Sequence, residues 1–322
     1  MVLDGEATSH RRFCDLPQLL RSGDLLVLNE TRVIRARLIG AREPSGSRVE
    51  LLLLHPSGSP WYDAQARDWI ALAKPARRLR VGDRIAFGSL GHASVRAQLD
   101  EGMRELRFEI DLPFEEFLTH AGRMPIPRYI HNDSTQAQER YQTVFARNPG
   151  SVAAPTASLH FTPALLESIE RRGIKIARIS LDIGLGTFRP VTAETIDAHA
   201  MHAEAYTIER SAAAAIEGAR NSNRRIVAAG TTVVRALEGN FEAHGAVRAG
   251  RHVTGLFVTP GFRFKLVDAL ITNFHLPRST LLMLVAAFTG RERILHAYAE
   301  AIAHRYRFYS FGDAMLIFGK SA

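Results

Sequence analysis

The sequence predicts a mixed α/β fold, in which a large α/β domain carries an inserted small all-β, barrel-like domain. Two observations lead to this prediction. Residues 24–111 consist mainly of short segments rich in Val, Ile and Leu, broken by Gly, Pro, Ser and Asp, the pattern of successive strands. From Thr162 onward, strand-like and helical segments alternate, which is typical of an α/β sheet. We therefore expect a discontinuous large domain at 1–36 and 113–322, with the β-rich domain at 37–112.

The first strand of the large domain is predicted at DLLVLN, directly before the β-rich insertion. The insertion contains the strand-like segments RARLIGAR, SRVELLLLH, DWIALAK, DRIAFGSL, HASVRAQL and MRELRFEID. Several short strands in succession favour a small barrel or a sandwich.

The helices of the large domain are predicted from capping residues and apolar spacing. Thr162 can cap a helix that has Pro163 at its first position and ends at Gly173, and KIARISLDI follows as a buried strand. The alternation recurs: SAAAAIEGARN leads to RRIVAA, VVRALEGNF leads to GLFVTP, and STLLMLVAAFTGRERILHAYAEAIAHRY leads to AMLIF. This order of elements favours the α/β class.

Composition limits the kind of protein this can be. The 322 residues are 46% hydrophobic and 23% charged, which excludes a disordered chain. The longest apolar run, 281–288, is far shorter than the roughly 20 residues of a membrane-spanning helix, and the first residues lack the apolar stretch of a signal peptide. A single cysteine, Cys14, excludes an internal disulfide. We therefore expect a soluble, cytoplasmic protein.

The net charge of +8 has the sign expected of a protein that meets phosphate, although genomic base composition is an equally good explanation of the excess of Arg over Lys. Two basic segments stand out. In KPARRLR (74–80) we favour a solvated turn over an RNA contact. In HRYRFYSFGD (304–313), Arg307 and Asp313 beside Gly312 indicate a buried ion pair or a site.

Small or polar residues follow several predicted strands directly, and ligands of α/β folds bind at the carboxyl ends of strands. Turn chemistry explains any one of these segments, but together they favour a binding site. A helix predicted to open at Gly230 offers backbone N–H groups to a phosphate, a carboxylate or a ribose hydroxyl. The segments are Asn29-Glu30-Thr31-Arg32, Gly184-Leu185-Gly186-Thr187, Gly230-Thr231-Thr232 and Thr272-Asn273-Phe274-His275.

Two other motifs have more than one interpretation. DIGLGTF contains a G-x-G but no third Gly, and Pro190 follows where a helix should begin, so a dinucleotide fingerprint is disfavoured. His199, His202 and Glu204 have the residue types of a metal site. A turn-forming histidine pair and a metal-free acid/base role are both favoured over a metal.

Eight segments, spread over almost the whole chain, together form a specific pattern. They are GDLLVLNETRVIRARL, ERYQTVFA, GSVAAPTASLHFTP, LDIGLGTFRPV, HAMHAE, GTTVVRALE, FKLVDALITNFHLPRSTLLMLVAAF and YRFYSFGDAML. In this order they resemble the S-adenosylmethionine:tRNA ribosyltransferase-isomerase family of queuosine biosynthesis. Members of that family have a large α/β domain that carries a small β-barrel. One departure is Asp182, which stands where the family motif has His.

The resemblance implies that the ribosyl moiety of S-adenosylmethionine is transferred to, and isomerised on, 7-aminomethyl-7-deazaguanine at the tRNA wobble position. Epoxyqueuosine-tRNA forms, and adenine and methionine are released. The implied partners are a tRNA anticodon loop and S-adenosylmethionine, with no membrane, no metal and no cofactor beyond that co-substrate, and the implied state is a monomer. Two alternatives remain: a family member that binds tRNA without catalysis, and a metal-dependent hydrolase built on His199, His202 and Glu204.

The resemblance and the chemistry together indicate the site residues. Proton transfer is assigned to His202, Glu204 and His275, and Arg235 is expected to pair with a substrate charge. Stacking on a purine is assigned to Phe161, Phe188 and Phe274, although a core position is the commoner role of Phe. The other predicted substrate-binding residues are Asn29, Thr31, Arg32, Tyr141, Gln142, Thr156, His160, Gly184, Gly186, Thr187, Gly230, Thr231, Thr232, Asn273, Arg307 and Asp313.

Overall fold

The chain forms two compact units in a computed structural model that describes residues 1–127, 129–130, 134–184, 196, 199, 201 and 203–319. The larger unit comprises Met1–Thr31, Thr143–Ala146 and Pro155–Ala322. The smaller unit comprises Arg32–Gln142 and Arg147–Ala154.

The larger unit is built on a nine-stranded sheet with the order β16-β14-β13-β3-β15-β17-β18-β1-β2. The four central strands β13, β3, β15 and β17 are parallel, so their carboxyl ends lie along one edge of the sheet. All five residues of β3 are buried, as expected for a central strand covered on both faces. The strands are β1 (Val2–Asp4), β2 (Ala7–Ser9), β3 (Leu25–Asn29), β13 (Lys175–Leu181), β14 (Glu204–Ile208), β15 (Ile226–Ala229), β16 (Gly250–Thr254), β17 (Ala269–Asn273) and β18 (Ala314–Phe318).

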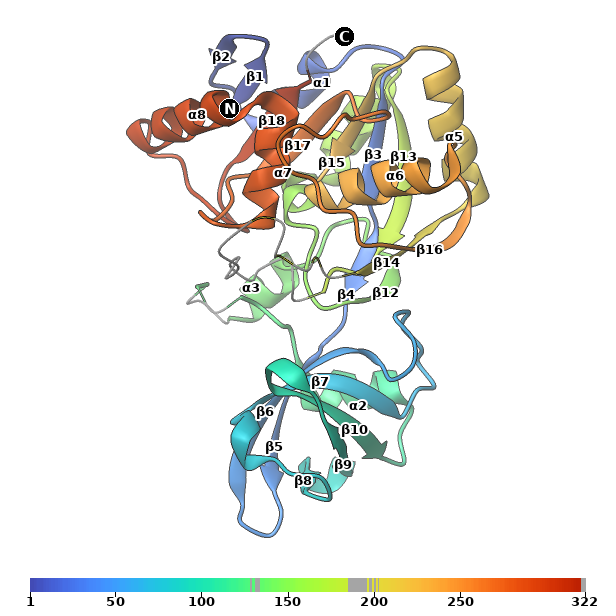
Figure 1. The fold of residues 1–322 in the computed structure, drawn as a ribbon, viewed down its shortest axis with the longest axis vertical. Helices are drawn as coiled ribbons and strands as arrows, with labels where there is room; N and C mark the ends of the chain where they lie inside the picture. Colours follow the sequence, from blue (N-terminus) through green and yellow to red (C-terminus); the bar gives the residue numbers. More distant parts are fainter. Residues whose placement is uncertain are drawn as a thin grey trace. The chain divides into compact units, whose positions relative to one another are not determined.

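Helices pack on the central strands and begin where the sequence provides caps. Thr162 Oγ1 accepts a hydrogen bond from the backbone N–H of Leu165 at 3.2 Å, with Pro163 at the first helical position, which confirms the predicted start of α4. Figure 1 shows α6 crossing the central strands. The helices of this unit are α1 (Leu16–Leu19), α4 (Pro163–Arg171), α5 (Arg210–Asn221), α6 (Thr231–His244), α7 (Thr280–Thr289) and α8 (Arg291–Ala303), with short 3₁₀ turns η1 (Phe13–Asp15) and η5 (Thr156–His160).

Two predicted elements of the larger unit are wrong. The single long helix expected from Ser279 to Tyr306 is two helices, because Gly290 has φ +96° and separates α7 from α8. The segment GLFVTP is not a strand; the strand after α6 is β16, whose residues pair with β14. A local apolar run cannot show which neighbouring segment finds a partner strand.

The smaller unit is a closed antiparallel barrel. Its sheet has the order β11-β5-β6-β7-β10-β9-β8, and β8 also pairs with β5, so six strands close on themselves. This confirms the predicted mixed α/β fold with a barrel. The strands are β5 (Arg37–Arg42), β6 (Ser47–Pro56), β7 (Asp68–Lys74), β8 (Arg84–Ala86), β9 (His92–Gln98), β10 (Met103–Glu109) and the short β11 (Gly122–Arg123).

The barrel closes through a glycine and is filled by aromatic side chains. A Cβ at Gly40 would lie 2.6 Å from Ile85 Cγ2 and 2.8 Å from the carbonyl oxygen of Ala86, so only glycine lets β5 approach β8. The rings of Trp69 and Phe114 stack with centroids 5.0 Å apart. The barrel interior therefore includes side chains from outside its strands.

The smaller unit extends beyond the strand-rich segment 37–112. It also contains α2 (Phe114–Ala121), α3 (Thr135–Arg140) and the short 3₁₀ turns η2 (Ala76–Arg78), η3 (Gly88–Leu90) and η4 (Asp100–Gly102). β4 (Thr31–Val33) and β12 (Asn148–Ser151) form a separate two-stranded sheet.

The sole cysteine of the chain belongs to the larger unit. This residue, Cys14, is exposed in η1. In the described part of the chain, no helix combines the length and the apolar character that a bilayer crossing requires.

Candidate active site at the carboxyl edge of the parallel strands

Asn29 joins the ends of the first two parallel strands. Its Oδ1 accepts a hydrogen bond from the backbone N–H of Leu181, and its Nδ2 donates to the Leu181 carbonyl, both at 3.0 Å. The backbone N–H of Thr31 also donates to Asn29 Oδ1, at 3.1 Å. The Asn29 side chain is fully buried and holds β3 to β13, and its predicted contact with substrate stays a prediction.

Thr31 and Asp182 meet directly beyond these strand ends. Thr31 Oγ1 donates to Asp182 Oδ1 at 3.1 Å. Burial raises the pKa of Asp182 to about 7, and the hydrogen bond from Thr31 opposes part of this rise. A carboxyl group that titrates near neutral pH can both accept and donate a proton. Asp182 was not among the predicted site residues; its position directly after a buried strand was the signal for it.

The next strand, β15, leads into the N-terminus of α6. The backbone N–H of Gly230 donates to the carbonyl of Ile271 at 2.8 Å, which fixes this turn to β17. Thr231 and Thr232 follow in the first turn of the helix and are buried. No side-chain hydrogen bond caps α6 within the described residues, so its first N–H groups suit an anionic or hydroxyl ligand.

A second polar group lies at the end of β17. Thr156 Oγ1 donates to Asn273 Oδ1 at 2.9 Å, and Asn273 Nδ2 lies 3.4 Å from His160 Nε2. Burial lowers the pKa of His160, so the neutral ring is favoured. Residues predicted from two motifs far apart in the sequence, 150–163 and 264–288, are thus brought together here.

His275 lies two residues beyond β17 and is held at two points. Its Nε2 is 2.7 Å from Thr272 Oγ1, and its backbone N–H donates to the Tyr298 hydroxyl at 2.7 Å. Burial lowers the pKa of His275 to about 4. Near neutral pH the ring is therefore uncharged and suited to hydrogen bonding with a ligand.

Glu204 and Arg235 form a buried ion pair between β14 and α6. Arg235 Nη1 contacts Glu204 Oε2, and Arg235 Nε donates to the Leu256 carbonyl at 2.9 Å. Both side chains are at most 4% exposed. The charge that we expected Arg235 to offer to a substrate faces Glu204 instead. The acid/base role predicted for Glu204 stays a prediction.

Phe161 and Phe274, for which stacking on a purine was predicted, pack in the core, and the stacking stays a prediction. Phe161 packs in the core against Phe13, with ring centroids 5.1 Å apart, and is 2% exposed. Phe274 is fully buried, with the Phe308 ring at 4.9 Å. Neither ring has a face open to a base, so the commoner core role applies to both.

Tyr141 and Gln142 lie within the smaller unit, and their side chains contact other residues of that unit. Tyr141 is fully buried, which raises the pKa of its hydroxyl. Gln142 Oε1 accepts from the Val33 backbone N–H at 3.0 Å, and its Nε2 donates to the Val33 carbonyl at 3.2 Å. The direct substrate contacts predicted for these two side chains stay predictions.

The predicted pair Arg307–Asp313 exists but is not buried. Arg307 Nη2 lies 3.2 Å from Asp313 Oδ1, and the Arg307 side chain is 77% exposed. The backbone N–H groups of the two residues also bond across the turn, Arg307 N to Asp313 Oδ2 and Asp313 N to the Arg307 carbonyl, both at 2.7 Å. The pair therefore stabilises a turn at the surface, not a contact in the core.

Two cavities contain predicted site residues. One, of about 390 Å³ in the larger unit, is lined by His160 and Asp313. The other, of about 290 Å³ in the smaller unit, is lined by Arg32 and Gln142. Three basic side chains that the sequence analysis did not assign to a site also line the first cavity: Arg11, Arg12 and Arg305. The two consecutive arginines near the start of the chain were a signal for this basic character.

Four predicted residues, Gly186, Thr187, Phe188 and His202, lie outside the described residues, as does Pro190. Gly184 is described, and a Cβ there would meet nothing within 4 Å. His199 is described and lies against Phe257, with ring centroids 5.3 Å apart.

The fold and site define an α/β protein with an inserted closed barrel and a set of buried polar residues at the carboxyl edge of its parallel strands. Comparison with known proteins gives the family: the chain belongs to the queuosine biosynthesis protein family, which matches residues 1–317.

Relatives with known names support this assignment. The chain is 52% identical to the S-adenosylmethionine:tRNA ribosyltransferase-isomerase of Gloeobacter violaceus, over 98% of this chain and 88% of that protein. It is 51% identical to the protein of the same name from Symbiobacterium thermophilum, over 97% of this chain and 89% of that protein. The crystal structure of S-adenosylmethionine tRNA ribosyltransferase from Thermotoga maritima is similar, with 33% identity and a TM-score of 0.52, over 99% of this chain and 91% of that one.

Proposed function

We propose that this protein is an S-adenosylmethionine:tRNA ribosyltransferase-isomerase. It transfers the ribosyl moiety of S-adenosylmethionine to 7-aminomethyl-7-deazaguanine in tRNA and isomerises it, which gives epoxyqueuosine-tRNA, adenine and methionine. The observation that carries this proposal is the family match over residues 1–317, together with identities of 51% and 52% to named enzymes.

The reaction needs a base beside the sulfonium methylene and a hydrogen-bond donor beside the purine. The methylene beside the sulfonium of S-adenosylmethionine must lose a proton, and adenine must leave as a stabilised base. Asp182 has the pKa of about 7 that suits a base at neutral pH. His275, neutral at this pH and hydrogen-bonded to Thr272, suits a polar contact with the purine. The nucleophile is the amine of the tRNA base, so the protein supplies none.

The remaining polar groups suit substrate binding. The N-terminus of α6 at Gly230 and Thr231 offers backbone N–H groups to the ribose hydroxyls or to the methionine carboxylate. Thr156, Asn273 and His160 form a hydrogen-bonded group at the end of the neighbouring strand β17. No cofactor beyond S-adenosylmethionine is required by this chemistry.

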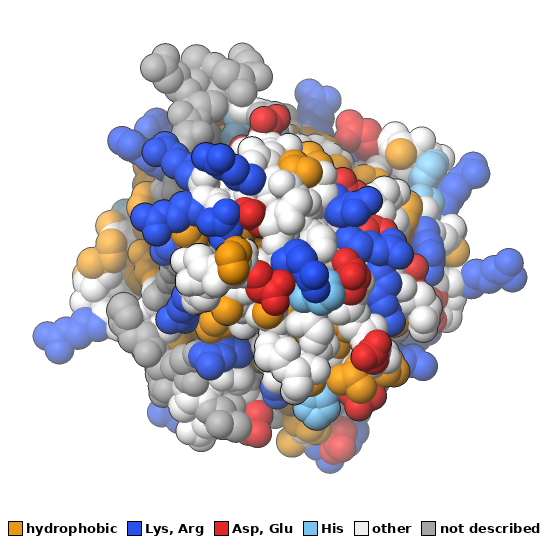
Figure 2. Space-filling view, turned by 90° about the horizontal axis from the view of Figure 1, so that it is seen from below, with side chains coloured by type: hydrophobic (Ala, Val, Ile, Leu, Met, Phe, Trp, Pro, Cys, Tyr) orange, Lys and Arg blue, Asp and Glu red, His pale blue; other side chains and the backbone are white. Residues whose placement is uncertain are grey.

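For the tRNA, we propose that the wobble base of the anticodon loop enters the site and that exposed cations hold loop phosphates. Figure 2 shows Lys and Arg side chains spread across one face of the molecule, with Asp and Glu side chains between them. In the smaller unit the exposed basic turn contains Lys74, Arg77, Arg78 and Arg80. We further propose that the enzyme acts as a cytoplasmic monomer.

The test is to incubate the purified protein with S-adenosylmethionine and a tRNA that carries 7-aminomethyl-7-deazaguanine. Adenine release and the mass of the modified nucleoside are measured together, and a tRNA with unmodified guanine at the same position is the control. We expect adenine and the epoxyqueuosine mass only with the modified tRNA. Tight binding of the modified tRNA without either product would instead support the non-catalytic, tRNA-binding alternative.

A further inference from the structure

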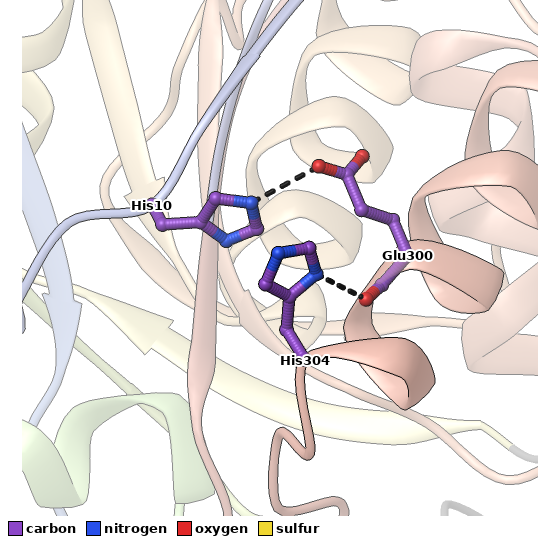
Figure 3. Close-up of side chains that lie close together, drawn as sticks. All are labelled: His10, Glu300 and His304. Atoms are coloured by element: carbon purple, nitrogen blue, oxygen red, sulfur yellow. Dashed lines mark hydrogen bonds and ion pairs between the residues drawn. The ribbon is translucent and has the colours of Figure 1, made fainter.

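A cluster of two imidazoles and one carboxylate lies at the end of α8, apart from the residues assigned to the reaction. Glu300 and His304 are one helical turn apart at the C-terminus of α8, and His10 reaches them from the segment after β2 (Figure 3). One ligand atom from each of the three side chains lies within 4.8 Å of the others.

The hydrogen bonds of His304 leave one ring nitrogen suited to a metal. Its Nδ1 lies 2.9 Å from the backbone carbonyl of Glu300, an acceptor, so Nδ1 carries the hydrogen. The other nitrogen, Nε2, then has a lone pair. Metal-binding histidines are usually oriented in this way, with the second ring nitrogen donating to a carbonyl or carboxylate.

His10 is oriented by two partners of different kinds. Its Nε2 lies 3.0 Å from Glu300 Oε1, and its Nδ1 lies 2.7 Å from the Tyr306 hydroxyl. When Tyr306 donates to Nδ1, the hydrogen on Nε2 points to the carboxylate. When Nδ1 instead donates to the Tyr306 oxygen, Nε2 has a lone pair directed at the place that hydrogen occupied. The second arrangement is the one that a metal ion requires.

We propose that His10, Glu300 and His304 bind a divalent transition-metal ion, for which zinc is the best match. Zinc takes imidazole nitrogen and carboxylate oxygen at about 2.0–2.2 Å in a tetrahedral arrangement, with water as the fourth ligand. Magnesium and calcium prefer all-oxygen sites, which disfavours them here. The ion takes the place of the hydrogen between His10 Nε2 and Glu300 Oε1, and His10 then carries its hydrogen on Nδ1, where it donates to the Tyr306 oxygen.

The ligands need only side-chain movement to reach bonding distance. His10 and His304 are exposed, and their rings stack with centroids 4.3 Å apart and planes 29° apart. Rotation about the side-chain bonds of these exposed residues brings the nitrogens together without change in the core. The Glu300–His304 spacing on the helix already places two ligands on one face.

A bound ion would fix the N-terminal segment beside the basic cavity. His10 directly precedes Arg11 and Arg12, which line that cavity together with His304. Phe13 follows, and its ring stacks on His160 with centroids 4.9 Å apart. The metal would therefore join the end of α8 to a segment that forms one wall of the cavity, which gives the site a structural role distinct from the chemistry of ribosyl transfer.

Isothermal titration of zinc chloride into the full-length, untagged, chelator-treated protein tests this proposal. We expect one equivalent to bind, and we expect His10→Gln and His304→Gln each to weaken binding at least about tenfold. The matched control is His120→Gln. His120 and Glu116 form an exposed helical pair 3.9 Å apart in the smaller unit, and no third ligand joins them among the residues that the structure describes, so this variant should bind zinc as the wild type does.

Two further measurements distinguish a loss of metal binding in the histidine variants from a loss of folding. Cobalt in place of zinc should give the visible absorption of a tetrahedral site in the wild type and not in His10→Gln. Zinc should slow hydrogen exchange in residues 5–15 of the wild type only. The proposal is overturned if the wild type binds no stoichiometric zinc, or if both histidine variants bind it as tightly as the wild type.

Discussion

Asp182 has an environment unlike that of a surface carboxylate. It follows a buried strand, accepts a hydrogen bond from Thr31, and titrates near pH 7 because burial disfavours its charge. A base with this pKa is close to the optimum for proton transfer at neutral pH. Its role in the proposed reaction is therefore open to direct test.

We expect Asp182→Asn to lower the rate of adenine release by about 100-fold or more, since the amide cannot accept a proton. In the wild type the rate should rise with pH through a midpoint near 7. Thr31→Val keeps the carboxyl but removes the hydrogen bond that lowers its pKa, so the midpoint should move to higher pH. A midpoint that moves to lower pH, or an active Asp182→Asn variant, contradicts the assignment.

Asp182 should also affect the pH dependence of stability. It ionises near pH 3.8 in the unfolded chain and near 7 in the folded one, so the folded protein binds more protons between these values. The free energy of unfolding should therefore fall as pH rises from 4 to 7, by at most about 4 kcal/mol, relative to Asp182→Asn. Urea denaturation of both proteins at pH 4.5 and pH 7.5 measures the difference, and an equal response of the two would exclude a buried, neutral Asp182.

At the scale of residues, the sequence predicted which side chains stand at the strand ends but not what each of them contacts. The residues after each strand were predicted because strand ends meet at one edge of the sheet. Whether a side chain there faces a ligand or the protein depends on packing from distant segments. Asn29 faces Leu181, and Phe274 faces Phe308. Nothing in the adjacent residues distinguishes these cases from a ligand contact.

At the scale of elements, the buried ion pair Glu204–Arg235 joins β14 to α6. Both charges have left water, and their contacts include the one between them and the bond from Arg235 to the Leu256 carbonyl. Removing one member of such a pair leaves an uncompensated buried charge, which costs far more than the pair itself contributes.

We expect Arg235→Met to lower the free energy of unfolding by about 3–5 kcal/mol, and the double variant with Glu204→Gln to recover part of this loss. The control is Arg107→Met in the exposed pair between β10 and β7, which should cost less than about 1 kcal/mol. Urea denaturation measures each. A loss at Arg235 no larger than the loss at Arg107 would show that the pair is solvated.

Element boundaries were predictable where a local signal exists. Thr162 and Pro163 mark the start of α4 because a cap and a fixed backbone angle are properties of those residues themselves. Strand partners are not local properties, so GRHVT (250–254) rather than GLFVTP (255–260) became β16. Gly290 was the sequence signal for the break between α7 and α8. The apolar spacing continues across this glycine, so one long helix was predicted instead.

The whole molecule consists of two units with separate hydrophobic cores. The barrel core includes Trp69, Phe114 and Phe117, whereas a core cluster of the larger unit includes Leu26, Phe161 and other side chains from the parallel strands and nearby helices. The strand pattern predicted a barrel at 37–112, but the inward-facing residues of α2 could not be inferred from strand spacing. Their burial accounts for the greater extent of the smaller unit.

Separate cores predict separate unfolding transitions. Both tryptophans, Trp61 and Trp69, belong to the smaller unit, so intrinsic fluorescence follows the barrel, whereas far-UV circular dichroism follows both units. We expect the two urea denaturation curves to have different midpoints. Coincident curves with equal slopes would show that the units unfold as one cooperative system.

The same distribution of residues has a practical consequence. The exposed thiol of Cys14 belongs to the larger unit and is the sole cysteine of the chain. An acceptor dye attached there forms, with the indoles of the other unit, a donor–acceptor pair for resonance energy transfer that needs no engineered residue. A change in transfer efficiency when S-adenosylmethionine or tRNA is added would report a change in the distance between the dye and the indoles on substrate binding.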